Sequence, residues 1–164
     1  MPEENERLGT IGRARTPEQF KAMQETVGKG KCPFCDYETL RKTAIKEGEF
    51  WIMKSNDFPY KHHRSHLVIV YKRHSKDNDI MAVPPEAWAE LGKIFKWAVK
   101  KFRMKGGGLV MRFGDPEHNA STIRHLHAHI QEPDLTGPAK ATFAKSEEKK
   151  AQDAKRIKGF VDKP

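Results

Sequence analysis

Three histidines at alternate positions, His125, His127 and His129, form the stretch of this sequence best suited to chemistry. They stand in TIRHLHAHIQ, and apolar residues separate them. Successive side chains of a strand point to opposite faces, so the three imidazoles would share one face. Imidazole can bind a metal, attack phosphorus as a nucleophile or donate hydrogen bonds to phosphate oxygens. The pattern predicts a strand whose histidine row serves metal binding, catalysis or both.

A second motif with chemical potential is the cysteine pair in CPFC, Cys32 and Cys35. Such a pair serves either thiol redox chemistry or zinc binding, and the preceding KGKC turn favours a zinc knuckle. No other cysteine exists, so the two remaining ligands of a tetrahedral site would have to be histidines. A nucleic-acid zinc finger is excluded, because no His-x₃₋₅-His pair follows about 12 residues downstream. Two reduced cysteines without a metal stay open as the alternative.

Helices and strands are expected around these motifs. Thr16, Pro17 and Gln19 predict the start of a helix that stops at Gly28. Residues 84–103 predict a long helix with an apolar stripe made by Trp88, Leu91, Phe95, Ala98 and Phe102. Strands are expected within 49–55, 65–74, 109–113 and 123–131. This order predicts an α+β domain with an antiparallel sheet.

Composition limits the class of protein. The mean hydropathy is −0.80 and the net charge is +9. The chain lacks an apolar run of about 18 residues and an N-terminal apolar stretch, so we expect no membrane partner and no signal peptide. Much of the excess charge lies in the C-terminal residues, as in a solvated tail, which disfavours nucleic-acid binding. Reduced cysteines and these absences predict a cytoplasmic protein.

The same features predict the domain organisation. Residues 1–15 are expected to be a loose N-terminus, and 16–135 a single domain that includes the CPFC knuckle. Residues 136–164 are expected to be a Lys-rich tail, partly disordered or forming a surface helix around 145–158.

Four motifs together resemble the histidine triad superfamily of nucleotide hydrolases and transferases. HLHAHIQ resembles its His-φ-His-φ-His signature, with Gln131 where an apolar residue is usual. SHLVIVYKRH resembles the preceding strand and turn, with Tyr71 in place of proline, and residues 56–59 resemble a ribose-binding Asn/Asp-x-x-Pro. CPFC matches the cysteine pair of zinc-containing branches. The resemblance spans about residues 32–133 and implies a five-stranded antiparallel sheet with a long helix packed on it.

The resemblance implies a role for each matching residue. His127 would be the nucleophile that attacks the α-phosphorus, and His129 and His66 would support it and the phosphate. A structural Zn²⁺ would be held by four residues: Cys32, Cys35, His74 and His125. Substrate contacts would come from four others: Asn56, Asn119, Ser121 and Thr122.

Other polar residues near the motifs have weaker assignments. The loop before the triad departs from the family pattern at Ala120, which leaves the specificity for the leaving group open. Arg112 is a candidate source of positive charge, whereas Arg124 would point away from the histidine row. Three further histidines are expected at the surface: His62, His63 and His118.

The implied function is cleavage at the α-phosphate of dinucleoside polyphosphates or nucleoside phosphoramidates through a nucleotidyl-histidine intermediate. A phosphorolytic or sugar-nucleotide nucleotidyltransferase is the alternative within the enzymes, since phosphate would then replace water as acceptor. A catalytically silent, zinc-stabilised module that binds nucleotides or RNA is a second alternative, and a hydrolase with a catalytic zinc is a third. The resemblance also implies a homodimer.

Overall fold

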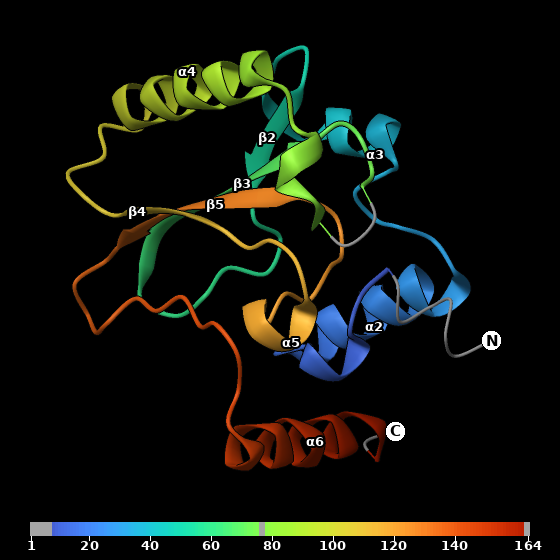
Figure 1. Ribbon diagram of the computed structural model, residues 1–164. Helices are drawn as coiled ribbons and strands as arrows, with labels where there is room; N and C mark the ends of the chain where they lie inside the picture. Colours follow the sequence, from blue (N-terminus) through green and yellow to red (C-terminus); the bar gives the residue numbers. More distant parts are fainter. Residues whose placement is uncertain (1–7, 76–77, 163–164) are drawn as a thin grey trace.

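The computed structural model describes residues 8–75 and 78–162, and a five-stranded antiparallel sheet lies at its centre (Figure 1). The strand order is β1-β2-β3-β5-β4. The strands are β1 (Ala44–Glu47), β2 (Trp51–Ser55), β3 (His63–Tyr71), β4 (Gly108–Met111) and β5 (His127–Pro133). The α+β class with this sheet is confirmed. Only β1 falls outside the segments in which strands were expected.

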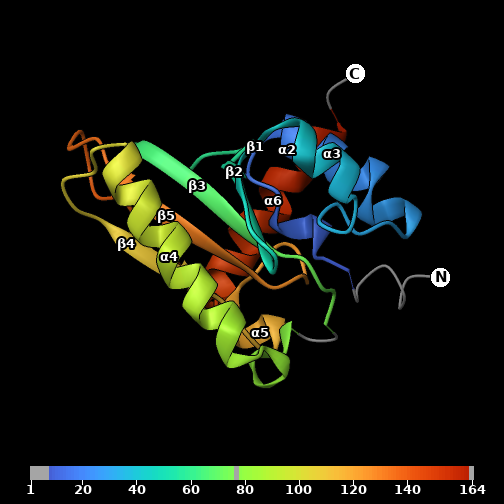
Figure 2. The same cartoon turned by 90° about the horizontal axis from the view of Figure 1, so that it is seen from above.

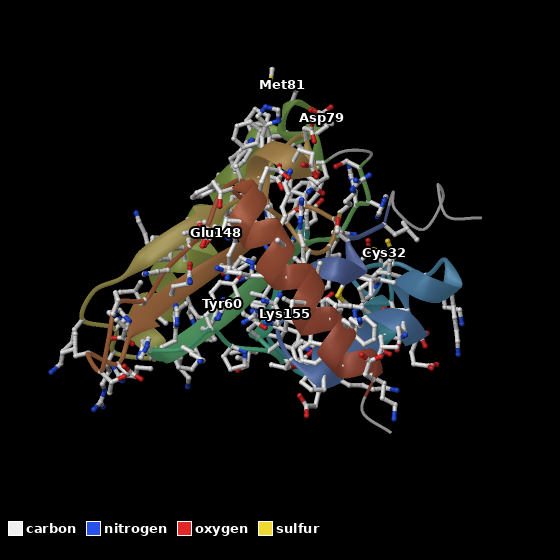
Figure 3. The ribbon with its side chains drawn as sticks, turned by 90° about the horizontal axis from the view of Figure 1, so that it is seen from below. Cys32, Tyr60, Asp79, Met81, Glu148 and Lys155 are labelled. Carbon is white, nitrogen blue, oxygen red and sulfur yellow. The ribbon has the colours of Figure 1, made fainter. Side chains whose placement is uncertain are left out.

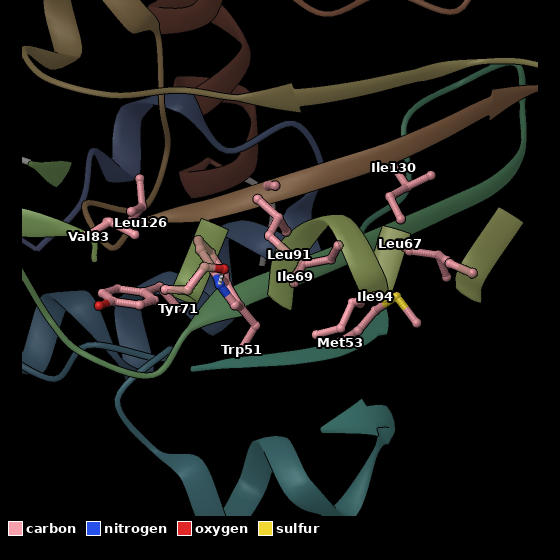
Figure 4. Packing of buried hydrophobic residues seen from close by; sticks show 13 residues of the cluster. Trp51, Met53, Leu67, Ile69, Tyr71, Val83, Leu91, Ile94, Leu126 and Ile130 are labelled. Atoms are coloured by element: carbon pink, nitrogen blue, oxygen red, sulfur yellow. Dashed lines mark hydrogen bonds between the residues drawn. The ribbon is translucent and has the colours of Figure 1, made fainter. Parts of the chain in front are cut away.

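One face of the sheet is covered by the long helix α4 (Pro85–Lys101), as Figure 2 shows from above. Alternate strand residues such as Trp51, Ile69 and Ile130 pack against the helix in the main core (Figure 4). The helix buries four residues there: Ala87, Leu91, Ile94 and Ala98. Trp88, expected in the apolar stripe, is 38% exposed. The buried stripe is rotated toward Ala87, whose carbonyl accepts a hydrogen bond from the Trp51 indole N–H at 2.7 Å.

Glu90 of α4 accepts hydrogen bonds from three backbone N–H groups, those of Glu49, Phe50 and Trp51, at 2.7, 2.8 and 2.9 Å. The carboxylate thereby provides hydrogen-bond acceptors for the backbone N–H groups of the turn that leads into β2. We expect Glu90→Ala to lower the free energy of unfolding by about 2–3 kcal/mol, because three amide donors lose a charged acceptor. Urea unfolding would measure this. Glu86→Ala, on the exposed first turn of the same helix, should cost less than about 1 kcal/mol, and an equal loss would contradict the assignment.

The shorter helices lie on the opposite side of the sheet: α2 (Pro17–Glu25), α3 (Tyr37–Lys42), α5 (Pro116–Asn119) and α6 (Glu147–Val161). The described residues also form three 3₁₀ turns: η1 (Ile11–Arg13), η2 (Val27–Lys29) and η4 (Ile80–Ala82). Thr16 caps α2 by accepting from the Gln19 N–H, as predicted. The stop at Gly28 is wrong in position. The chain continues through η2 and ends the helical segment at Gly30, whose φ of 70° suits glycine.

The C-terminal residues return to the N-terminal part of the chain. After β5 the segment crosses toward α6, which lies beyond α2 on the side of the sheet opposite α4 (Figure 1). Phe160 of α6 packs on Phe20 with ring centroids 6.1 Å apart. Arg156 donates to the Ala14 carbonyl at 3.1 Å. Among the described residues, no helix is both long and apolar enough to span a membrane.

Candidate active site and metal site

The pairing of β3 with β5 gathers histidines on the sheet face away from α4. His127 lies opposite Val70 and His129 opposite Val68, while His66 of β3 is paired with the next residue in the row, Gln131. The ring centroids of His127 and His129 are 4.9 Å apart, and those of His66 and His129 are 5.0 Å apart. The predicted alternation along this strand is therefore present for the second and third histidines.

The expected row of three histidines is divided, because β5 begins only at His127. His125 precedes the strand and is fully buried, and its ring faces His74 at a centroid distance of 5.1 Å. Phe34 of the CPFC turn contacts the rings of both His125 and His127 edge-on. The histidine row thus separates into one member beside the cysteines and two in the pocket described below.

The first histidine belongs to a compact group with both cysteines and His74. The ligand atoms of the four residues lie within 4.8 Å of one another. Sγ of Cys32 is 3.4 Å from Nδ1 of His125, and Sγ of Cys35 is 3.3 Å from Nδ1 of His74. The two Nδ1 atoms are 3.2 Å apart. A tetrahedral zinc site with two sulfur and two nitrogen ligands has ligand spacings of roughly 3.3–3.8 Å, so these residues fit Zn²⁺.

The hydrogen bonds of His125 also fit a metal ligand. Its Nε2–H donates to the Tyr71 carbonyl at 2.6 Å, which leaves the Nδ1 lone pair facing the two sulfurs. Without a metal, burial and the neighbouring Cys35 raise the pKa of the Cys32 thiol to about 12. A metal ion would hold the thiolate instead. The group therefore provides four ligands, which is the complete shell of a structural site.

The backbone of His125 positions the next histidine. Its carbonyl accepts a hydrogen bond from Nδ1–H of His127 at 2.5 Å. The proton of His127 is therefore on Nδ1, and the lone pair is on Nε2. One residue thus links the two sites, through its ring on one side and its carbonyl on the other.

His66 and His129 form a second hydrogen-bonded pair. The Tyr60 N–H donates to Nδ1 of His66 at 3.1 Å, so the proton of the neutral ring is on Nε2. That Nε2–H lies 2.9 Å from Nδ1 of His129 and donates to it. His129 accepts at Nδ1, so its own proton is on Nε2. The arrangement makes His129 a hydrogen-bond donor beside His127.

The buried histidines are held in the neutral form. Burial lowers the pKa of His127 to about 4 and that of His129 well below its ordinary value. Burial, followed by the nearby charges of His63 and Arg15, lowers the pKa of His66 to about 3. A neutral ring keeps one lone pair, which a nucleophile or a hydrogen-bond acceptor requires.

The low pKa of His66 predicts an acid-sensitive fold. Below about pH 6.5 the unfolded chain binds a proton at this residue, whereas the folded protein does so only near pH 3. The contribution of this residue to the free energy of unfolding is therefore fully present above pH 6.5 and is lost as the pH falls toward 3. At pH 5 the loss attributable to this residue is about 2 kcal/mol. Urea unfolding at pH 7 and pH 5 should show a smaller difference for His66→Gln than for wild type, whereas exposed His118→Gln should match wild type.

A cavity of about 250 Å³, here called the nucleotide pocket after the ligand proposed below, opens beside His127 and His129. Its lining includes apolar groups from α2, the CPFC turn and β3, among them Met23, Phe34 and Val68. It also includes the two histidines and Arg112. Apolar groups together with imidazoles and a guanidinium suit a ligand that has both a flat apolar ring and a phosphate.

The residues expected to contact substrate are only partly brought together. Asn56, Ser121 and Thr122 line the nucleotide pocket, and the buried Ser121 hydroxyl has no hydrogen-bond partner in the described part of the chain. Asn119 instead donates to the carbonyls of Phe113 and Gly114 and accepts from the Ser121 N–H. Its amide shapes the loop and is not among the groups that line the pocket.

Four further residues of the pocket lie outside the expected set or had a weaker assignment. Arg15 donates to the Phe58 carbonyl at 2.5 Å and lies 4.1 Å above the ring of Tyr60. Phe34 and the buried Arg112 complete the wall. The position of Phe34 inside the CPFC motif is the one signal by which the sequence could have indicated its role. Arg15 and Tyr60 reach the pocket through tertiary packing alone.

The other surface assignments have mixed outcomes. His118 is exposed, as expected. His63 is half-buried, stacks on His66 and accepts from the Gln131 side chain at 2.8 Å. The polar residue at position 131, unusual for the resembled signature, therefore holds the histidine that stacks on His66.

Comparison with known proteins supports the fold but not a close relationship. No family model matches the sequence, and no curated protein matches it. The structure is similar to a histidine triad protein from Clostridium difficile, with 16% identity, a TM-score of 0.50 and coverage of 65% of this chain and 94% of that chain. A hypothetical protein from Leishmania major also has 16% identity and a TM-score of 0.50, with coverage of 77% and 95%.

A Zn-bound histidine triad family protein from Mycobacterium smegmatis is 19% identical, with a TM-score of 0.48 and coverage of 78% and 91%. The zinc assignment for this chain rests on its own four residues and their spacing. The strand order, the helix α4 on one face and the histidines on the other agree with the implied architecture. The chain has the fold of the histidine triad proteins.

Proposed function

We propose that the protein is a nucleotide hydrolase that cleaves at the α-phosphate through a nucleotidyl-histidine intermediate. The observation that carries the proposal is the hydrogen bond from Nδ1–H of His127 to the His125 carbonyl, which leaves Nε2 as a free nucleophile. His127 also lines the nucleotide pocket, whose apolar groups would pack against a base. Nucleophile and substrate cavity thus coincide.

In the first step, the Nε2 lone pair of His127 attacks the α-phosphorus and forms an N–P bond. The bond from phosphorus to the leaving group breaks, and the leaving group departs with the electron pair. The His125 carbonyl stabilises the positive charge that develops on the imidazole, through the Nδ1–H bond. His129 and Arg112, both in the pocket wall, would donate to the phosphate oxygens.

In the second step, water attacks the phosphorus and the N–P bond breaks. The electron pair of that bond returns to Nε2 of His127, the attacking water loses a proton to the solvent, and a nucleoside monophosphate is released. His66 acts through His129, because its Nε2–H fixes the proton of His129 on the nitrogen that would face the phosphate. His66 is therefore a positioning residue.

Zn²⁺ in the group formed by the two cysteines, His74 and His125 would supply structural cross-linking, not Lewis-acid chemistry. Four protein ligands complete a tetrahedral shell and leave no position for water or substrate. The metal would hold the ring of His125, and hence the carbonyl that orients His127.

The direct test is the mass of the intact protein seconds after mixing with adenosine phosphoramidate or diadenosine triphosphate. The reaction should be quenched in alkali, because the N–P bond of a phosphoramidate breaks in acid. We expect a wild-type adduct of one adenylyl group that disappears as AMP accumulates. Absence of both adduct and AMP across a panel of nucleotides, with the fold intact, would overturn the proposal.

Two alternatives have distinct products. A phosphorolytic enzyme would release ADP when inorganic phosphate is added, whereas a hydrolase would continue to release AMP. A silent nucleotide- or RNA-binding module would form no adduct and would bind nucleic acid with a steep salt dependence.

The expected homodimer and cytoplasmic location stay proposals. β4 is an edge strand of the sheet and carries Leu109, which is 39% exposed. An exposed apolar residue on an unpaired strand edge suits pairing with a second copy. Light scattering on the purified protein would measure its oligomeric state.

A further inference from the structure

A second cavity, of about 180 Å³, adjoins the nucleotide pocket. We call it the basic pocket, because its wall includes seven cationic residues: Arg13, Arg15, Arg112, Lys140, Lys145, Lys149 and Arg156. Arg15, Tyr60 and Arg112 line both cavities, so the two are adjacent along one surface. Figure 3 shows α6 crossing this side of the molecule, with Tyr60 beside it.

The C-terminal segment builds much of this pocket. Lys140 comes from the stretch after β5, and Lys149 and Arg156 come from α6. The stretch is held at the pocket by Arg112, which donates to the Thr142 carbonyl from Nε at 3.1 Å and from a terminal nitrogen at 3.0 Å. The Lys-rich residues expected to be solvated therefore contribute charge next to the site.

Positive charge in the basic pocket is not balanced by its own carboxylates. Asp153 is the one acidic residue among the described wall residues, and it already pairs with Arg156 at 2.7 Å and with Lys145. Arg15 and Arg112 bond to backbone carbonyls rather than to carboxylates. Within the described part of the chain, Lys140 and Lys149 form no ion pair at 4 Å or less.

The guanidinium groups also repel one another. Burial lowers the pKa of Arg15, and the positive charges of Arg156 and Arg112 lower it further. Holding like charges together in a partly buried site costs free energy, which a bound polyanion would offset. Phosphate oxygens are the groups that guanidinium and ammonium side chains bind most readily.

We propose that the basic pocket binds the phosphates of the leaving group, so that the enzyme prefers nucleotides whose leaving group carries two or more phosphates. The inference rests on the proposed function, since the adjoining pocket must hold the nucleoside monophosphate that is transferred. In a displacement at phosphorus the leaving group departs on the side opposite the nucleophile. Cations that contact the leaving group stabilise the negative charge that the leaving oxygen acquires as its bond to phosphorus breaks.

A short polyphosphate fits the pocket better than RNA does. The cavity is small and is bounded by α6, the stretch after β5 and the N-terminal segment, whereas a single strand would need a long basic groove with aromatic stacking surfaces. The experiment must therefore distinguish binding of a short polyphosphate from binding of RNA.

The test compares Lys140→Gln/Lys149→Gln with the matched control Lys155→Gln/Lys158→Gln. All four lysines are exposed, and the control pair lies on α6 but does not line the basic pocket (Lys155 is labelled in Figure 3). Calorimetry at constant ionic strength, with every protein also carrying His127→Asn so that the tetraphosphate is not cleaved, would give the affinities for AMP and for adenosine 5′-tetraphosphate. We expect the protein with wild-type lysines to bind the tetraphosphate at least about tenfold more tightly than AMP, and the first variant to lose about fivefold or more of that preference.

Kinetics provide the second reading. The ratio of kcat/KM for diadenosine tetraphosphate to that for adenosine phosphoramidate should fall by a similar factor in the first variant and stay at the wild-type value in the control. The inference would be overturned if both variants lost the preference equally, or if the protein with wild-type lysines bound the two nucleotides with equal affinity. AMP binding and phosphoramidate turnover would still support the proposed function in either case. Displacement of the tetraphosphate by single-stranded RNA at equal affinity would also overturn it. Absence of AMP binding and of all turnover would reject both proposals together.

Discussion

Replacement of His127 by asparagine is expected to reduce kcat for every substrate of the enzyme by about 10⁴-fold or more, because it removes the proposed nucleophile. The asparagine amide can still donate to the His125 carbonyl in place of Nδ1–H, but it has no counterpart of the Nε2 lone pair. Steady-state assays of AMP release would measure the loss. The adenylyl adduct should be absent from the variant.

Two observations would show that the loss is chemical and not structural. The variant should keep a wild-type affinity for AMP within a few-fold, because the apolar lining of the nucleotide pocket is unchanged. His118→Asn, at an exposed histidine outside the pocket, should keep wild-type turnover. Substantial activity in the asparagine variant would contradict the assignment and direct attention to another group in the pocket.

Removal of the metal ligands is expected to have the largest effect on stability. We expect the purified protein to contain one zinc per chain, and Cys32→Ala or His74→Ala to lose it. The four ligands come from distant parts of the chain, so the ion would cross-link the CPFC turn to the segments after β3 and before β5. A single domain has roughly 5–15 kcal/mol of stability, and loss of a structural zinc should remove a large share of it.

Metal analysis and thermal unfolding would measure both effects, with His118→Ala as the matched histidine control. Chelation should lower the unfolding temperature together with activity. If chelation abolished activity while the unfolding temperature stayed unchanged, the zinc would be catalytic and the structural assignment would be wrong.

The sequence alone determined much of the site, where local patterns carry the information. Period-two alternation predicted that His127 and His129 share a sheet face, and register with β3 confirms it. The CPFC spacing predicted a knuckle, and resemblance supplied His74 and His125, which the structure brings to the cysteines. Alternation and turn spacing depend on neighbouring residues only, so a sequence displays them.

Local patterns also have a limit, which His125 illustrates. It has the same two-residue spacing as the rest of the row, yet its ring turns toward the cysteines because β5 begins two residues later. Likewise, the stop of the first helical segment moves from Gly28 to Gly30, where the chain needs a left-handed residue.

Only the tertiary structure decided the proton positions and the basic pocket. The Nε2 lone pair of His127 follows from a hydrogen bond to His125, and the proton of His129 follows from a chain that starts at the Tyr60 N–H. Arg15 and Lys149 meet near the site although they are far apart in sequence. Composition reports how much charge a chain carries, but only packing decides which charges share a cavity, because those contacts join residues with no local pattern in common.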